Sequence, residues 1–132
     1  MIDKAVAVVP HPGGAPLRCL VFDHPLAGAQ IVKGTVEPGE RPLIAARREL
    51  WEEAGLVARS GVPLCISDAI VSGEVWHFSL LRVALPVAEA WDWHTTDGGG
   101  LTFRCRWQAL TDDGVLSGRF LRAWHAIRAA LA

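Results

Sequence analysis

The sequence of 132 residues contains no tyrosine, a single methionine and only three cysteines. Cys19, Cys65 and Cys105 lie far apart, and no two of them form a C-x-x-C pair. An odd number of widely separated cysteines argues against a disulfide framework and gives no zinc-binding spacing. Each cysteine lies in an apolar stretch, so we expect each to pack as a small hydrophobic side chain.

The sequence also lacks an excess of either charge. Thirteen basic and fourteen acidic residues give a formal net charge of −1. This balance provides no electrostatic footprint for a nucleic-acid polymer or an anionic membrane, although a small anionic ligand bound through a metal is compatible with it. No uncharged apolar run is long enough to span a membrane, and the N-terminal segment is too polar for a secretory signal. We therefore expect a cytoplasmic protein.

The length and the hydrophobic content of 51% predict one globular domain over residues 1–132, without repeats or a dividing linker. Periodicity predicts helices over residues 41–54 and after Ser117, the latter as a plausible N-cap. Strands are expected at residues 5–9, 17–22, 30–33, 57–69, 75–85 and 101–107, the first two as a hairpin, with a loop over residues 86–100. Strands before, between and after two helices indicate an α/β (α+β) fold, a mixed sheet with helices packed on it.

Three glutamates near the end of the first predicted helix are the clearest chemical feature. Glu49, Glu52 and Glu53 are spaced i, i+3, i+4, so they project from one face within a turn of each other. Like charges at that spacing repel unless a cation lies between them. Carboxylate oxygens suit Mg²⁺ or Mn²⁺, and such a metal can assist cleavage of a phosphate anhydride. The alternative is a solvated, glutamate-rich helix face.

The whole segment around these glutamates resembles a known motif. Residues 34–56, GTVEPGERPLIAARRELWEEAGL, match the Nudix box, G-x5-E-x7-R-E-U-x-E-E-x-G-U, at every specified position. With each residue type at roughly 6% abundance, the seven fixed identities coincide by chance on the order of 10⁻⁹ per starting position. Lys33 resembles the lysine that often precedes the box, and residues 91–107 are similar to the loop and strand after the central sheet in bacterial members.

The resemblance implies an α/β/α sandwich, with a mixed sheet and helices on both faces, that hydrolyses diphosphate compounds with Mg²⁺ or Mn²⁺. The metal ligands that it implies are Glu49, Glu52, Glu53 and the carbonyl of Gly34. Glu52 or Glu53 would also activate the attacking water. Arg48 and Glu40 would join the helix to the preceding loop and orient the ligating carboxylates.

The substrate-binding residues are less clearly indicated. The candidates are Lys33, Trp93, Asp97 and Arg104. Many family members use a further acid from a loop outside the box, and we favour Asp97 because it adjoins three glycines in the longest predicted loop. Glu74, Glu89 and Asp92 are the alternatives, and a turn aspartate that bonds its own backbone explains Asp97 equally well.

The leading hypothesis is therefore a Nudix hydrolase that cleaves the P–O–P linkage of a nucleoside di- or triphosphate derivative. A (d)NTP or oxidised-nucleotide pyrophosphatase is the first guess, and sugar-nucleotide or dinucleoside-polyphosphate hydrolases are alternatives. A catalytically silent, nucleotide-binding regulatory domain and a Nudix-fold isomerase are less favoured, since the box carboxylates are complete and no cysteine has an activating neighbour. The expected partner is a small-molecule diphosphate, with no nucleic-acid polymer and no membrane, for a monomer or homodimer.

Overall fold

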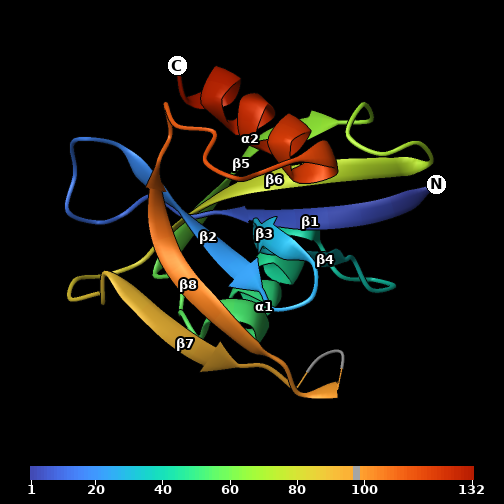
Figure 1. Ribbon diagram of the computed structural model, residues 1–132. Coiled ribbons are helices and arrows are strands. Elements are labelled where there is room, and N and C mark those ends of the chain that lie inside the picture. The colour runs from blue at the N-terminus through green and yellow to red at the C-terminus, as the bar shows by residue number, and fades with distance from the viewer. Residues whose placement is uncertain (97–98) are drawn as a thin grey trace.

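The computed structural model describes residues 1–96 and 99–132, which form eight strands and two helices (Figure 1). In chain order these are β1 (Ile2–Val8), β2 (Arg18–His24), β3 (Gly28–Gln30), β4 (Lys33–Thr35), α1 (Pro42–Ala54), β5 (Ser60–Ser67), β6 (Glu74–Arg82), β7 (Ala90–His94), β8 (Thr102–Ala109) and α2 (Gly118–Leu131). Neither helix has the length and apolar character that crossing a bilayer requires, as far as the described residues go.

The strands form two four-stranded sheets. The first has the order β4-β1-β6-β5 and is mixed, since β1 and β6 run parallel while its other neighbours are antiparallel. The second has the order β3-β2-β8-β7 and is antiparallel throughout. The expected hairpin of the first two strands is wrong, because β4 and β6 occupy both edges of β1. The segment just after β1 meets β2 through an isolated antiparallel bridge between Pro10 and Cys19.

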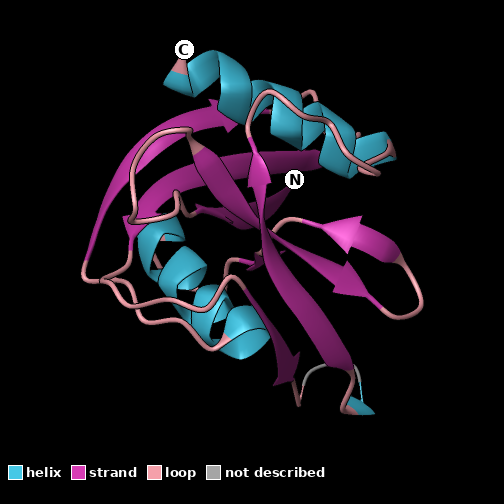
Figure 2. Cartoon of the chain, turned by 60° about the vertical axis from the view of Figure 1, so that its left-hand side comes forward, coloured by secondary structure: helices cyan, strands magenta, loops and turns pink. Residues whose placement is uncertain are grey.

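The two helices cover opposite sides of these strands, which confirms the expected α/β/α layering (Figure 2). Alternation along β1 shows why, because side chains of successive residues point to opposite faces of a strand. Ala5 and Ala7 pack in the cluster that contains the apolar side chains of α1, whereas Val6 and Val8 pack in the cluster of α2. Both faces of β1 are therefore buried from Ala5 to Val8, as the apolar run at this end of the strand requires.

Helix α1 follows the sequence prediction closely. It begins at Pro42, whose fixed φ suits a first helical turn, and it ends at Ala54, where Gly55 caps it in the left-handed conformation with φ 70°. Its buried side is made mostly of small residues, Ala45, Ala46, Leu50 and Ala54. Small side chains let the helix lie close to the strands, so the polar residues beside them are held near β4.

The predicted loop over residues 86–100 contains strand β7, which the sequence analysis missed. The side chains of Trp91 and Trp93 are half-buried on one face of it, while Asp92 and His94 are exposed on the other. The Trp-x-Trp spacing is the period of a strand with one covered face. The polar composition of residues 86–100 favoured a loop, so this period was not recognised as a strand.

The remaining expectations concern α2 and the cysteines. Ser117 has extended backbone angles before α2, but its side chain makes no capping hydrogen bond. All three cysteines are free, with Cys19 and Cys105 buried and Cys65 half-buried. Burial raises the pKa of the Cys19 and Cys105 thiols to about 12, so both remain protonated hydrophobic side chains at neutral pH.

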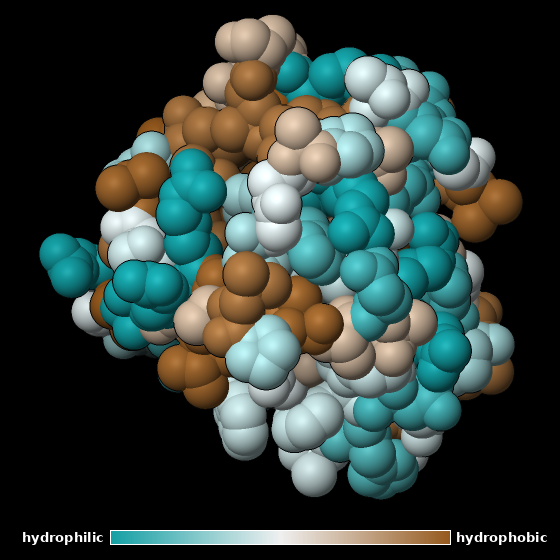
Figure 3. All heavy atoms as spheres, turned by 90° about the vertical axis from the view of Figure 1, so that its left-hand side faces the viewer, coloured by the Kyte–Doolittle hydropathy of each residue, from teal (hydrophilic) through white to brown (hydrophobic). Residues whose placement is uncertain are grey.

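Figure 3 shows the face that carries the loops from β1 to β2 and from β6 to β7. Apolar side chains gather there in patches between polar ones. The exposed apolar residues of these loops include Leu17 and Leu85. Exposed apolar side chains are usual on a protein surface, so this face does not by itself indicate a binding site.

Candidate active site

The candidate site begins where α1 contacts β4, at Gly34 and Glu49. A Cβ atom on Gly34 would lie 2.0 Å from both Cδ and Oε1 of Glu49. The Glu49 carboxylate therefore lies directly on the Gly34 backbone, in space that only glycine leaves open. Glu49 is only 7% exposed, so the packing fixes its side chain on this side of the helix.

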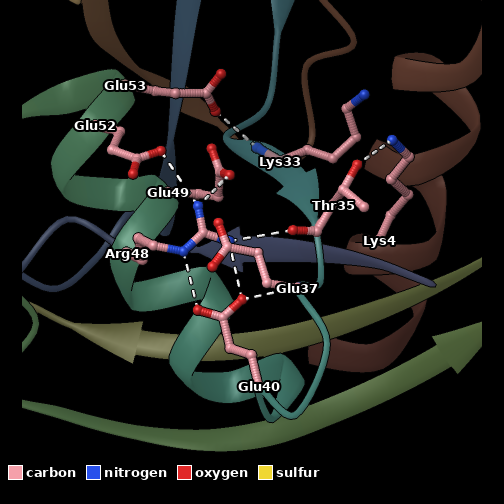
Figure 4. Close-up of polar contacts among 9 residues, drawn as sticks. All are labelled: Lys4, Lys33, Thr35, Glu37, Glu40, Arg48, Glu49, Glu52 and Glu53. Atoms are coloured by element: carbon pink, nitrogen blue, oxygen red, sulfur yellow. Dashed lines mark hydrogen bonds and ion pairs between the residues drawn. The ribbon is translucent and has the colours of Figure 1, made fainter. Parts of the chain in front are cut away.

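Arg48 is the centre of the polar network (Figure 4). Its Nε and Nη2 each donate to one oxygen of Glu40, both at 2.9 Å, and Nη2 also donates to the carbonyl of Thr35 at 3.1 Å. The paired hydrogen bonds from Arg48 hold the pKa of the Glu40 carboxyl below its usual range, and the same bonds raise the pKa of Arg48. One guanidinium thus ties α1 to the loop before it and to β4.

The same guanidinium reaches the glutamates of the helix. Arg48 Nη1 donates to Glu49 Oε1 at 2.8 Å and to Glu52 Oε2 at 3.3 Å. This contact offsets the repulsion that the spacing of the carboxylates would otherwise produce. Among residues 1–96 and 99–132, no three acidic, histidine or cysteine side chains converge as a ready-made metal cluster. The oxygen donors of the helix nevertheless fit a hard divalent cation, and they lie beside the open backbone of Gly34.

Glu53 contacts β4 through the main chain of Lys33. Its Oε1 accepts a hydrogen bond of 2.9 Å from the Lys33 N–H. The Lys33 side chain extends away from the glutamates (Figure 4), and its Nζ lies 5.4 Å from the ring centroid of Trp76 and 5.7 Å from that of Phe120. Glu74, one of the alternative acids, accepts a hydrogen bond from Trp76 Nε1 at 2.8 Å.

Trp93 holds the end of α1. Its Nε1 donates to the carbonyl of Glu52 at 3.0 Å, and its ring lies against Gly55, where a Cβ would be only 2.4 Å from ring carbons. The ring also meets Trp51 edge to face, with centroids 5.2 Å apart. The sequence suggested Trp93 for substrate binding, whereas its contacts here are with the helix that carries the glutamates.

Two further residues of the β7–β8 hairpin contact the same turn. Trp91 Nε1 donates to the carbonyl of Ala54 at 2.8 Å, and Cys105 Sγ lies 3.9 Å from the carbonyl of Glu53. The sequence did not predict that Trp91 and Cys105 would contact the end of α1. The Trp-x-Trp alternation of β7 was the available indication, since it places the two indoles on one face. Together these contacts complete the hydrogen bonding of carbonyls that a helix end leaves without partners.

Arg104, Asp92 and Glu89 bond to partners outside the Arg48 network. Arg104 forms an exposed ion pair of 3.1 Å with Asp92 across the β7–β8 hairpin. Glu89 accepts hydrogen bonds from Arg18 at 2.7 and 3.4 Å. Asp97 lies outside the described residues. The structure thus brings the box residues together, while Arg104, Asp92 and Glu89 are bonded elsewhere.

A cavity of about 390 Å³ lies beside β4 and the start of α2. Its lining residues are Ala27, Gln30, Lys33, Ser117, Gly118, Arg119 and Phe120. Lys33 belongs to both places, since its N–H bonds to Glu53 and its side chain lines the cavity. The Lys33 side chain lines this cavity on the side of β4 that faces α2, since Lys33 lies opposite Val6 of β1.

Comparisons with known proteins agree with the box. A family model described as NUDIX domain matches residues 1–95. The search of curated proteins returned no match. Among solved structures, the NUDIX domain of Shewanella oneidensis NrtR complexed with ADP ribose is similar with a TM-score of 0.70 and 16% identity, over 100% of this chain and 89% of that one.

Two further solved structures resemble the chain. A MutT structure, from work on the Aliivibrio salmonicida and Vibrio cholerae proteins, has a TM-score of 0.62 and 19% identity over 85% of this chain and 82% of that one. An ADP-ribose pyrophosphatase from Streptococcus suis has a TM-score of 0.70 and 14% identity over 98% of this chain and 91% of that one. At these identities the likeness concerns the fold.

Proposed function

The chain belongs to the Nudix family, and from that premise we propose that it is a divalent-metal-dependent hydrolase of a nucleoside diphosphate derivative. The bond cleaved is the P–O–P linkage. We take residues 1–132 as a single catalytic domain, because β8 and α2, which follow the matched residues, pack in the same two apolar clusters as the rest. We further expect a cytoplasmic monomer or homodimer.

The observation that carries this proposal is the convergence on Arg48 of carboxylates from the helix and from the loop before it. Arg48 bonds to Glu40, Glu49 and Glu52 at 2.8 to 3.3 Å. A solvated helix face would leave its glutamates in water, whereas Glu49 is buried against Gly34. Such fixed, partly buried carboxylates are costly to the fold and are typical of functional sites.

In the proposed reaction Glu49, Glu52, Glu53 and the Gly34 carbonyl would hold Mg²⁺ or Mn²⁺. When bound, such a metal polarises a phosphoryl oxygen and lowers the pKa of a coordinated water. Glu52 or Glu53 accepts the proton of the attacking water. Arg48 keeps Glu49 and Glu52 on one side of the helix, so that the ligating oxygens need little reorganisation.

The substrate class follows from the neighbours only as a proposal. The MutT likeness fits our first guess, a (d)NTP or oxidised-nucleotide pyrophosphatase. Two of the similar structures are an ADP-ribose complex and an ADP-ribose pyrophosphatase, which favours a sugar-nucleotide substrate as the second candidate. A silent regulatory domain is less favoured, because the box glutamates and Arg48 are all present and in contact.

The test is a panel of nucleoside triphosphates, oxidised nucleotides, ADP-ribose, other sugar nucleotides and dinucleoside polyphosphates, with Mg²⁺ or Mn²⁺ and mass-spectrometric detection. Labelled water identifies the phosphorus that is attacked. We expect turnover by the wild type and a loss of at least about 100-fold in Glu53→Gln, since proton transfer to a positioned base contributes roughly 10²–10⁴. Glu89→Gln, which changes an exposed glutamate bonded to Arg18, is the control and keeps wild-type activity. Equal rates in wild type and Glu53→Gln would refute the enzyme proposal.

A further inference from the structure

We propose that a cavity at the start of β5 and the end of β6 is a second anion site, where the guanidinium groups of Arg59 and Arg82 bind a phosphate group. The cavity has a volume of about 300 Å³. Its lining residues are Pro10, Pro12, Arg59, Ser60, Arg82 and Val83. None of these lining residues belongs to the Arg48 network, so the inference does not depend on the proposed function.

Strand pairing brings the two arginines together. Arg82 is the last residue of β6 and lies opposite Ser60, the first residue of β5. The N–H of Arg59 donates to the Arg82 carbonyl at 2.8 Å, so the main chains of the two arginines are adjacent. Both side chains are exposed, and both line the cavity. The register of the sheet therefore places two guanidinium groups at one cavity.

The charges of these two arginines are not neutralised by the protein. Within the part of the chain that the structure describes, neither Arg59 nor Arg82 forms an ion pair with a carboxylate. The strand arginines Arg18, Arg104 and Arg106 each do, at 2.7 to 3.1 Å. Two like charges at one cavity repel each other, and a bound anion would remove that repulsion.

The loop between β1 and β2, on the face that Figure 3 shows, forms another side of the cavity. It contributes the rings of Pro10 and Pro12, and residues 9–17 contain no aspartate or glutamate. A carboxylate does approach this loop, since Glu89 Oε1 lies 3.6 Å from His11 Nε2, but Glu89 is paired with a different arginine. The loop therefore adds a rigid apolar wall and no negative charge.

The chemistry of the lining selects the ligand. Guanidinium groups stay charged and present planar sets of N–H donors that match the oxygens of a phosphate group, and the exposed Ser60 hydroxyl is a further donor. None of the lining residues is aromatic, so a nucleobase has no ring to stack on. A water molecule in the liquid takes about 30 Å³, so the cavity has room for a phosphate group with bound water. The ligand is therefore inorganic phosphate or a small phosphomonoester.

The direct test is isothermal titration calorimetry of the full chain with inorganic phosphate, in EDTA and at constant ionic strength. Arg59→Gln and Arg82→Gln should each bind phosphate about tenfold more weakly than wild type, as expected for the loss of one charged partner. Arg41→Gln is the matched control, because Arg41 is also an exposed arginine but lines a different cavity. It should bind phosphate as wild type does. A second titration, with methyl phosphate, shows whether the site takes a phosphomonoester as well as free phosphate.

Thermal unfolding distinguishes a binding role of the arginines from a structural one. Without phosphate, Arg59→Gln and Arg82→Gln should be at least as stable as wild type, because each substitution removes a like-charge repulsion. Phosphate should raise the Tm of wild type and of Arg41→Gln more than that of either variant, since a ligand that binds only the folded protein stabilises it. Circular dichroism measures Tm and confirms that each variant is folded.

Three results would overturn the site. The first is that wild type binds no phosphate, and the second is that Arg59→Gln and Arg82→Gln bind it as tightly as Arg41→Gln. The third is that chloride displaces phosphate as effectively as sulfate does at the same ionic strength, because that would show only screening of surface charge. None of these results bears on the comparison of wild type with Glu53→Gln, so the anion site and the hydrolase proposal stand or fall separately.

Discussion

The guanidinium of Arg48 and the carboxylate of Glu40 lie side by side, with two parallel hydrogen bonds of 2.9 Å between them. Glu40 precedes α1 and Arg48 lies in its second turn, so the pair fixes the loop to the helix. The remaining donor, Nη1, points to Glu49 and Glu52. The orientation of the Glu49 and Glu52 carboxylates therefore depends on the contact between Arg48 and Glu40, a residue eight positions before it in the chain.

Replacing Arg48 by lysine should disrupt this arrangement without removing the charge. An ammonium group cannot donate the planar, paired hydrogen bonds that Glu40 receives. We expect Mn²⁺ affinity to fall about tenfold, because residues that orient metal ligands contribute roughly that much or more. Titration calorimetry or electron paramagnetic resonance measures it. Arg47→Lys is the matched control, since Arg47 donates to the Ala58 carbonyl and not to the glutamates. Equal Mn²⁺ affinities in the two variants would contradict the role of Arg48.

The Glu40 contact should also be visible in the dependence of stability on pH. The Arg48 hydrogen bonds lower the pKa of Glu40 in the folded protein below its value in the unfolded chain. A carboxyl of this kind contributes stability above its unfolded pKa, about 4.3, and loses that contribution as the pH falls through the lower folded value. Glu40→Gln should therefore have a lower free energy of unfolding than wild type at pH 6. The difference in unfolding free energy between the two proteins should become smaller towards pH 3. Urea unfolding at several pH values measures this, and a constant gap would show that the pair does not stabilise the fold.

Gly34→Ala should displace Glu49. The added Cβ would lie 2.0 Å from Cδ and Oε1 of a buried side chain, so the Glu49 carboxylate has to shift. We expect a loss of about 1–3 kcal/mol in unfolding free energy, as for overpacking, together with weaker Mn²⁺ binding. Gly61→Ala is a useful comparison, because its Cβ would crowd the terminal methyl of Leu81 at 2.6 Å and no carboxylate is among its three nearest atoms. Unchanged Mn²⁺ binding in Gly34→Ala would show that Glu49 does not need this position.

Comparing Trp93→Phe with Trp107→Phe should distinguish an effect on stability from an effect on metal binding. It removes the indole N–H that reaches the Glu52 carbonyl, while most of the ring remains. Trp107→Phe removes a similar hydrogen bond of 2.9 Å, which runs to the Ala88 carbonyl before β7 and not to α1. Each should lower the unfolding free energy by about 1 kcal/mol, but only Trp93→Phe should weaken Mn²⁺ binding. The two free energies come from urea unfolding. If both variants bind Mn²⁺ as wild type does, the hairpin does not position the glutamates.

Local features explain what the sequence could predict. Helix α1, its Pro42 start and its Gly55 end depend on neighbouring residues, and the proximity of Glu49 and Glu52 follows from helical spacing. The partners of β1 depend on distant segments instead. Nothing in residues 5–22 distinguishes a hairpin from strands of separate sheets, because the parallel partner of β1 is β6, more than sixty residues later.

The direction of the Lys33 side chain was hidden for a related reason. Its place before the box suggested a phosphate contact, but the face of β4 is set by the register with β1. Likewise, the tryptophans of β7 were expected in a loop, and their hydrogen bonds to α1 require a hairpin that folds back over the helix. Motif spacing thus predicted which residues meet within one helix. The direction of the Lys33 side chain and the contacts of the β7 tryptophans depend instead on pairing between strands.

The end of α1 has a consequence for protein engineering. The carbonyls of Glu52, Glu53 and Ala54 are all contacted by side chains of the β7–β8 hairpin, 37 to 52 residues away in sequence. A chimera that transplanted residues 34–56 into another scaffold would carry the catalytic motif but leave those carbonyls without their donors. The portable unit is therefore discontinuous, and it consists of the motif together with residues 90–105.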